Sequence, residues 1–316
     1  MTELPQDTVQ RLACIGLTTP NAAALSEFYE RAFGFRALAR YHGREWPTAS
    51  GVSGIARRIA LRLGNEVIEL CQFTRPGRAY PLDASSSDLR FQHFAIVVGD
   101  MLAAYRRLCS VGGWSAISIG GPQRLPLSSG GVEAFKFRDP DGHPLELLAF
   151  PGQNIPKYWK VRATGLFFGI DHSAISVSDS LQSIAFYEAL GLRSVSRSVN
   201  SGTEQACLDG LSAPHVEVTA LAPSQSTPHV ELLRYRSDRR AAKPDLEDND
   251  VAATRLIFDT AKRSSAANFS NLQSLIDPDG HHLVLVHAIG REDFLNTSLN
   301  AVGDPPLVIA NPESAE

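Results

Sequence analysis

Short apolar strands followed by amphipathic helices recur along the chain. Apolar residues at positions 25, 28, 29, 32 and 33 have the i, i+3, i+4 spacing of one helical face, so a helix is predicted over 22–33. Asn21 precedes it at the position of an N-cap residue. The same order returns at 101–111 and 181–190, each preceded by an aspartate, and more weakly near Asp259. Each unit is therefore predicted to be a βαβββ module: a strand, a helix and about three further strands.

The two halves of the chain repeat one another in sequence. Three matches occur in the same order: Phe-Tyr-Glu at 28–30 and 186–188, Glu-Leu at 69–70 and 231–232, and Asp-Pro-Asp-Gly-His at 139–143 and 277–281. A shared order with drifting spacing indicates duplication followed by changes in loop length. The repeated Asp-Pro-Asp-Gly-His segments are predicted to be tight turns whose histidines, His143 and His281, face solvent.

Four modules in two halves predict an α+β fold, with tandem βαβββ modules forming two cup-shaped half-barrel domains. Fewer residues separate Asp259 from Asp277 than separate Asp100 from Asp139, so the fourth module is predicted to be truncated. The expected organisation is a first domain at 1–150, a linker at 151–165, a second domain at 166–290 and a C-terminal tail at 291–316.

Composition narrows the range of functions. Charged residues make up 20% of the chain and its net charge is −4, with no basic cluster of the kind that binds nucleic acid. No apolar stretch approaches the ~20 residues that span a bilayer, and the first residues do not form a secretory signal. The four cysteines are too dispersed for a disulfide framework. We expect a cytoplasmic protein whose partner is a small molecule, with a homodimer left open.

Four side chains at corresponding strand positions of the first two modules are candidate metal ligands. They are Cys14 and Glu69 in the first module, and His93 and Glu146 in the second. Carboxylates on alternating apolar strands are costly to bury without a partner, which favours a metal or a strong ion pair. A histidine with two carboxylates suits Zn, Ni, Mn, Co or Fe(II). Read singly, His93 is a structural histidine and Cys14 a small buried apolar residue.

The segments around these residues resemble the modules of the vicinal oxygen chelate superfamily, which includes glyoxalase I, extradiol dioxygenases and bleomycin resistance proteins. The resemblance is carried by LACIGLTTPN, VIELCQF, HFAIVVGD and FRDPDGHPLELLAF, covering residues 10–150 closely and 165–290 more loosely. Glyoxalase I has four ligand places, occupied in order by His or Gln, Glu, His and Glu. The resemblance puts them at Cys14, Glu69, His93 and Glu146, with Cys14 as the departure.

The second half departs further from that pattern. His172 and Glu231 occupy the first two places, whereas counting along the chain puts Ala252 and Val284 at the other two. His172 and Glu231 are therefore interpreted as remnants of the duplication, in a half that binds no metal. Extradiol dioxygenases carry a His and a Tyr before the Asp-Pro turn. Neither half has them there, and Lys136 lies near the tyrosine place, so ordinary ring cleavage is disfavoured.

The resemblance implies a divalent-metal-dependent enzyme whose metal binds two vicinal oxygens of a small-molecule substrate. Isomerase or lyase chemistry is favoured, with Glu146 or Glu69 as the catalytic base. The alternatives are a ring-cleaving dioxygenase-like enzyme and a non-catalytic binding protein of the antibiotic-resistance type. Arg44, Trp46 and Lys136 are predicted to contact the substrate at the mouth of the cup.

Overall fold

The computed structural model describes residues 8–44, 54–152, 154–225, 227–236, 244–260 and 272–287. The first module contains β1 (Val9–Thr18), α1 (Ala22–Phe33), β2 (Arg36–Arg44), β3 (Ile55–Leu63) and β4 (Glu66–Phe73). The second contains β5 (Phe91–Val98), α2 (Met101–Val111), β6 (Ser115–Ala116), β7 (Gln123–Arg124), the 3-10 turn η1 (Leu127–Ser129), β8 (Glu133–Arg138) and β9 (Pro144–Ala149).

The second half begins with a short helix in the predicted linker, α3 (Lys157–Lys160). The third module contains β10 (Phe167–Ser176), α4 (Ser180–Ala189), β11 (Arg193–Ser201), α5 (Thr203–Asp209), β12 (His215–Ala222) and β13 (His229–Tyr235). The fourth contributes β14 (Arg255–Thr260), β15 (Leu272–Ile276) and β16 (His282–His287) to the part of the chain that is described. The α+β fold and its βαβββ modules are confirmed, and no described helix is long and apolar enough to cross a membrane.

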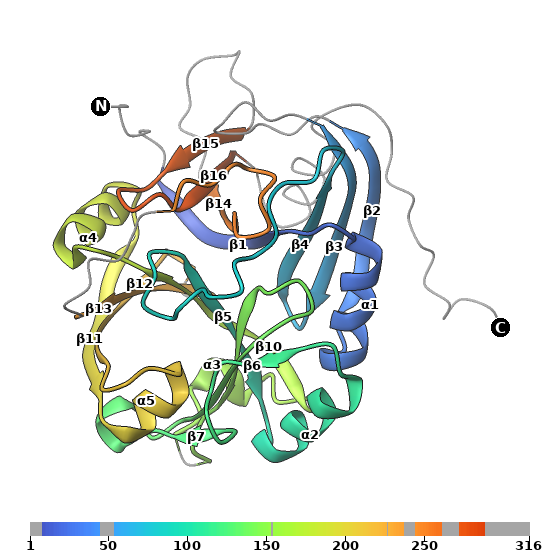
Figure 1. Ribbon diagram of the computed structural model, residues 1–316. Helices are drawn as coiled ribbons and strands as arrows, with labels where there is room; N and C mark the ends of the chain where they lie inside the picture. The colour runs from blue at the N-terminus through green and yellow to red at the C-terminus, as the bar shows by residue number, and fades with distance from the viewer. Residues whose placement is uncertain are drawn as a thin grey trace.

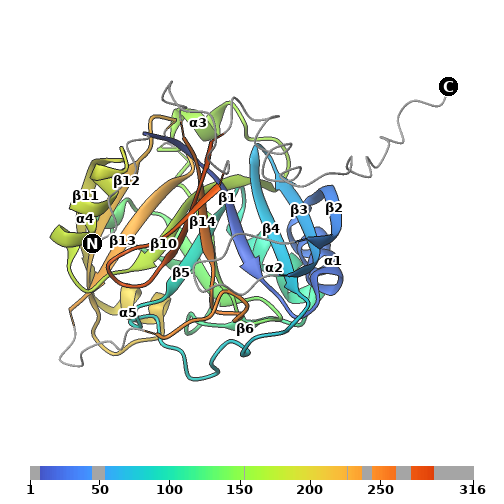
Figure 2. The same cartoon turned by 90° about the horizontal axis from the view of Figure 1, so that it is seen from above.

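The strands form two sheets, and each sheet combines modules from both halves of the chain (Figure 1). The seven-stranded sheet has the order β15-β16-β14-β1-β4-β3-β2, which joins modules one and four. The nine-stranded sheet has the order β11-β12-β13-β10-β5-β9-β8-β6, which joins modules two and three, and β7 pairs with β8. Figure 2 shows β14 beside β1, where the two strands pair antiparallel. The cups are thus closed across the halves, although the predicted domains at 1–150 and 166–290 assumed that each half closes its own cup.

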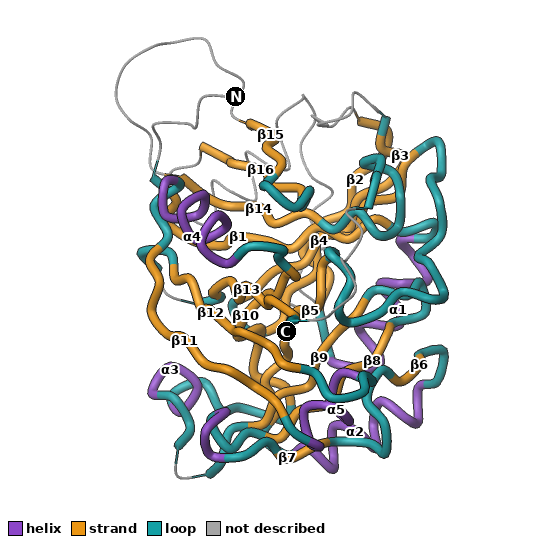
Figure 3. Tube along the Cα trace, turned by 60° about the vertical axis from the view of Figure 1, so that its left-hand side comes forward, coloured by secondary structure: helices purple, strands orange, loops and turns teal. Residues whose placement is uncertain are grey.

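The helices form where the sequence pattern predicts them. The side chain of Asn21 accepts a hydrogen bond from the backbone N of Ala24, at 3.1 Å, which satisfies a free donor of the first turn of α1. Gly34 ends this helix in the left-handed conformation, with φ of 75°, which costs a glycine little. The apolar face of α1 packs on β3 and β4, and in Figure 3 the strands occupy the middle of the molecule and the helices its periphery.

The modules of one half are joined through the repeated Asp-Pro-Asp-Gly-His turns. Asp139 accepts a hydrogen bond from the Tyr29 hydroxyl at 2.9 Å and lies 2.8 Å from Nδ1 of His143. The other ring nitrogen of His143 lies 2.9 Å from the carbonyl oxygen of Thr18, at the end of β1. His143 and its repeat His281 are both buried, so the prediction that they face solvent is wrong. A tight turn in the sequence does not reveal which strand will pack against it, and here the end of β1 does.

Candidate metal centre

Four neighbouring strands at the middle of the nine-stranded sheet carry the candidate site. The pairing aligns Glu231 of β13, Ala174 of β10 and His93 of β5 in one row across the sheet. A second row aligns His172 of β10, Ala95 of β5 and Glu146 of β9. Because residues two positions apart on a strand face the same side, both rows present their polar side chains to one face. Two histidines and two glutamates, one pair from each half, therefore meet at one place.

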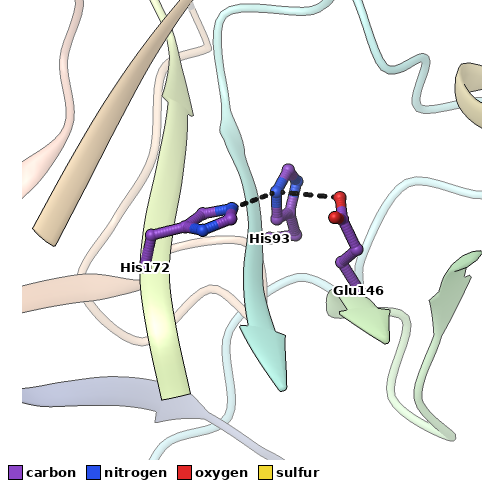
Figure 4. A group of neighbouring side chains, drawn as sticks. All are labelled: His93, Glu146 and His172. Carbon is purple, nitrogen blue, oxygen red and sulfur yellow. Dashed lines mark hydrogen bonds and ion pairs between the residues drawn. The ribbon is translucent and has the colours of Figure 1, made fainter. Parts of the chain in front are cut away.

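The nitrogen and oxygen atoms of these side chains converge closely, as Figure 4 shows for three of them. Nε2 of His93 lies 3.2 Å from Nε2 of His172 and 3.2 Å from Oε2 of Glu146. Nε2 of His172 lies 3.6 Å from Oε2 of Glu231. Ligands about 2.0–2.1 Å from a tetrahedral ion lie roughly 3.3 Å from each other, so this spacing suits one metal ion. His93, Glu146 and His172 form one of the groups that could hold such an ion.

The charges of the site also fit a divalent cation. Burial, with the charges of Lys136 and His172, holds the pKa of His93 well below its usual value, so this imidazole is neutral. Burial also raises the pKa of Glu146, against the charges of Lys136 and His172, which lower it. Nδ1 of His93 has no hydrogen-bond partner among the described residues. A cation bound between the two imidazoles would compensate the carboxylates and satisfy the nitrogens that now face each other.

Asp171 and Trp159 orient the ring of His172 through the nitrogen that does not face His93. Asp171 lies 3.1 Å from Nδ1 of His172, which leaves Nε2 of that ring directed at the site. Asp171 also accepts a hydrogen bond of 2.6 Å from the indole nitrogen of Trp159, in α3 of the predicted linker. Burial opposes ionisation of Asp171, but these hydrogen bonds and the charges of His229 and His172 lower its pKa to about 2. A carboxylate behind a histidine is the usual support of a metal-bound imidazole.

Glu231 has the same kind of support. Its Oε2 faces His172, and its Oε1 lies 3.5 Å from Nε2 of His229. Burial raises the pKa of Glu231, yet the charge of His172 and the contact with His229 outweigh burial and lower that pKa to about 2. The same ion pair, with Asp171, raises the pKa of His172 to about 9 against the effect of burial. Both oxygens of Glu231 are therefore engaged, whereas the contacts of Glu146 with His93 and Lys136 are both made by Oε2.

Only two of the four predicted ligands lie in this site. Cys14 and Glu69 are on β1 and β4 of the seven-stranded sheet. Glu69 forms a buried ion pair with Arg58, and the sulfur of Cys14 lies 3.7 Å from a backbone carbonyl. The prediction that these two converge with His93 and Glu146 is corrected because module one pairs with module four.

The two residues that complete the site are those that the sequence pattern indicates to be remnants of the duplication, His172 and Glu231. His172 and Glu231 supply the first and second ligand places, which the first half fills with Cys14 and Glu69 in the other sheet. A signal for this was present in the sequence. The second half retains the first two ligand places, and the first half lacks only the first, so together they contain one complete set of ligands.

The cluster faces a cavity of about 270 Å³. Its wall combines apolar residues such as Leu125, Leu148 and Val218 with polar ones that include Lys136 and Gln205. The predicted substrate contact of Lys136 is thus consistent with its position. Arg44 ends β2 in the other sheet and its side chain is not described, and Trp46 lies outside the described residues.

Comparisons with known proteins agree with this architecture. Residues 11–147 match the family model described as the Glyoxalase/Bleomycin resistance protein/Dioxygenase superfamily. Glyoxalase I from Zea mays is 19% identical, with a TM-score of 0.57, and the match covers 92% of this chain and 96% of that chain. A Bacillus subtilis protein provisionally assigned as a dioxygenase is 10% identical, with a TM-score of 0.55 and coverage of 88% and 85%. At these identities the likeness shows the fold alone, and no curated protein matches the sequence.

Proposed function

We propose that this chain, whose residues 11–147 belong to the glyoxalase/bleomycin resistance protein/dioxygenase superfamily, is a divalent-metal-dependent enzyme that acts on a small molecule with two adjacent oxygen atoms. One observation carries the proposal: His93, Glu146, His172 and Glu231 converge on a single buried cavity. Buried carboxylates need nearby cations, and burial raises the pKa of Glu146 even though Lys136 and His172 lie close to it. The site is therefore better explained as a metal centre than as a structural cluster.

The residues of the site divide into those that would bind the metal and one that would transfer a proton of the substrate. When bound, the metal supplies a Lewis acid that stabilises negative charge developing on a substrate oxygen. His93 and His172 would hold it through Nε2 once His172 has released its proton from that nitrogen, and Asp171 keeps the other proton of His172 on Nδ1. Glu231 is fixed between His172 and His229 and would be a permanent ligand. Glu146 is the less constrained carboxylate, so we assign it as the base that removes a proton from carbon next to a carbonyl.

Metal analysis of protein purified without chelators or an affinity metal tests this proposal. We expect about one equivalent of a divalent ion in the native chain, and its loss in His93→Ala, His172→Ala and Glu146→Ala. Cys14→Ala is the matched control, because Cys14 was a predicted ligand that lies in the other sheet, and it should retain the metal. A native protein that binds no Zn, Ni, Mn or Fe(II) even after loading would overturn the proposal. Solvent deuterium exchange into α-hydroxycarbonyl and α-ketocarbonyl compounds, followed by NMR, then tests the proton transfer.

A second candidate, an oxygenase, is favoured by one feature of the same cluster. His93, His172 and Glu146 are two histidines and one carboxylate, which is the ligand set of many non-haem Fe(II) oxygenases. Glu231 counts against it, because a fourth protein ligand leaves fewer open positions for oxygen and substrate. Oxygen consumption by the Fe(II)-loaded protein with catechols distinguishes the two functions. Ligand binding without turnover by any metal form would instead indicate a binding protein.

A further inference from the structure

A lysine is buried in the wall of the metal cavity, next to the proposed base. Lys136 is only 5% exposed and lies on β8, where the strand pairing puts it directly opposite Glu146 of β9. Its Nζ is 3.9 Å from Oε2 of Glu146, too far for a hydrogen bond but within the range of a strong charge interaction. Lysine is among the residues least often buried without a reason, so this position needs an explanation.

The other half of the chain supplies the partner of this lysine. Asp209, the last residue of α5, accepts a hydrogen bond of 2.6 Å from Nζ of Lys136. Gln205, one turn earlier in α5, donates a hydrogen bond of 2.6 Å to the other oxygen of Asp209. The end of α5 is anchored on the first half, because the Ser118 hydroxyl donates to the carbonyl oxygen of Leu208 at 2.9 Å. The lysine is therefore held in one place from both sides.

This arrangement leaves hydrogen-bonding capacity directed at the cavity. An ammonium group has three N–H donors, and among the described residues the Nζ of Lys136 forms a hydrogen bond only with Asp209. Gln205 also has a buried side-chain oxygen without a partner in the described part of the chain. Lys136 and Gln205 both line the cavity that His93 and His172 face. Unsatisfied buried polar groups are costly, which indicates a polar ligand at this wall.

We propose that Lys136, oriented by Asp209, donates a hydrogen bond to one of the two adjacent substrate oxygens and so selects substrates with a vicinal oxygen pair. This role rests on the proposed metal-dependent function. Because Nζ lies beside the carboxylate of Glu146, a substrate oxygen at the metal and Lys136 would meet within one small volume. The cavity of about 270 Å³ is below the roughly 300–1,000 Å³ of sites for drug-sized ligands, so the substrate is compact.

Binding of two small probes to the Co(II)-loaded protein tests the role of Lys136, with the cobalt absorption spectrum as readout. Acetohydroxamate presents two adjacent oxygens, whereas imidazole presents a single nitrogen and needs no second contact. The test variant is Lys136→Met combined with Asp209→Asn, since Lys136→Met alone leaves a buried aspartate unpaired. Lys136→Arg is the second variant, because it keeps a positive donor at the site and guards against a folding defect in the first.

We expect the double variant to bind cobalt as the native protein does and to bind acetohydroxamate about 10- to 100-fold more weakly, the loss of one charged hydrogen bond. Its affinity for imidazole should be unchanged, and Lys136→Arg should recover part of the acetohydroxamate affinity. Normal cobalt binding with unchanged acetohydroxamate affinity would overturn the role of Lys136 and leave the metal site standing. Absence of cobalt binding by the native protein would overturn both.

Discussion

The two sheets share one module plan but differ at the four positions that face the centre of each cup. In the nine-stranded sheet the two rows are Glu231–Ala174–His93 and His172–Ala95–Glu146. The same pairing in the seven-stranded sheet gives Glu69–Gly16–Arg255 and Cys14–Ile257–Val284. Arg255 therefore occupies the position that corresponds to His93, which counting along the sequence had assigned to Ala252. Both cups have a glutamate at the same position, Glu231 in one and Glu69 in the other, but the residues around it differ.

The seven-stranded sheet balances its glutamate with protein cations. Glu69 pairs with Arg58, and both side chains are 4% exposed. Arg255 lies over Gly16, where an added Cβ would come within 3.3 Å of its Nε. Two guanidinium groups thus occupy a cup whose counterpart contains the imidazoles of His93 and His172. A buried carboxylate needs a nearby cation, and the duplicated modules supply it in two ways: as arginine in one sheet and, on our proposal, as a metal ion in the other.

The largest expected effect is on stability. It tests whether Arg58 is a permanent cation beside Glu69, in contrast to a metal ion that can be removed from the other sheet. Arg58→Met should lower the free energy of unfolding by about 3–5 kcal/mol, because it leaves Glu69 buried without its partner. Urea unfolding at neutral pH measures this loss, and the metal content should stay unchanged. The double variant Arg58→Met with Glu69→Leu should recover most of the stability. A loss below about 1 kcal/mol for the single variant would mean that the pair is effectively solvated.

Metal binding should stabilise the nine-stranded sheet by mass action. Free metal at 100 times its dissociation constant should raise the free energy of unfolding by about 2.7 kcal/mol, and a chelator should reverse the gain. His172→Ala should abolish this dependence, because it removes a ligand at the centre of the cluster. Thermal unfolding across a metal titration is the measurement. An equal gain in the native protein and in His172→Ala would place the metal elsewhere.

A smaller effect on metal affinity is expected at Asp171 and Trp159, which support the ligand His172. Asp171→Asn should weaken metal affinity about 10- to 100-fold, since Asp171 fixes the ring of His172 through Nδ1. Trp159→Phe, which removes one hydrogen bond to Asp171, should weaken the affinity less. Competition with a chromophoric chelator gives both dissociation constants. If neither variant changes the affinity, Asp171 and the linker helix serve stability alone.

The smallest effect is expected at Cys14, the position that corresponds to His172. Cys14→Ala removes one buried sulfur and should cost about 1 kcal/mol of stability, similar to deletion of a small core group. Metal content should equal that of the native protein, because the cysteine is a packing residue in the seven-stranded sheet. Loss of metal in this variant would restore the site first expected from consecutive modules and contradict the observed strand pairing.

Much of this protein was determined by local sequence. The spacing of apolar residues specified α1, the repeated order of strand and helix specified α2 and α4, and Asn21, Asp100 and Asp179 cap them as expected. The internal repeat predicted βαβββ modules and an α+β fold. Each of these features depends on residues within a few turns or strands of one another, so a local pattern is sufficient. His93 and Glu146 were also recognisable as candidates, because polar residues on apolar strands are unusual wherever the strands lie.

The composition of the site was decided by tertiary structure. The first strand of every module is available for pairing with the first strand of another. The internal repeat therefore cannot specify whether module two pairs with module one or with module three. Pairing β5 with β10 brings His172 and Glu231 to His93 and leaves Cys14 and Glu69 in another sheet. The burial of His143 depends in the same way on a distant contact, with Thr18 at the end of β1. Strand edges are alike in sequence, and only the packing of the whole chain selects which of them meet.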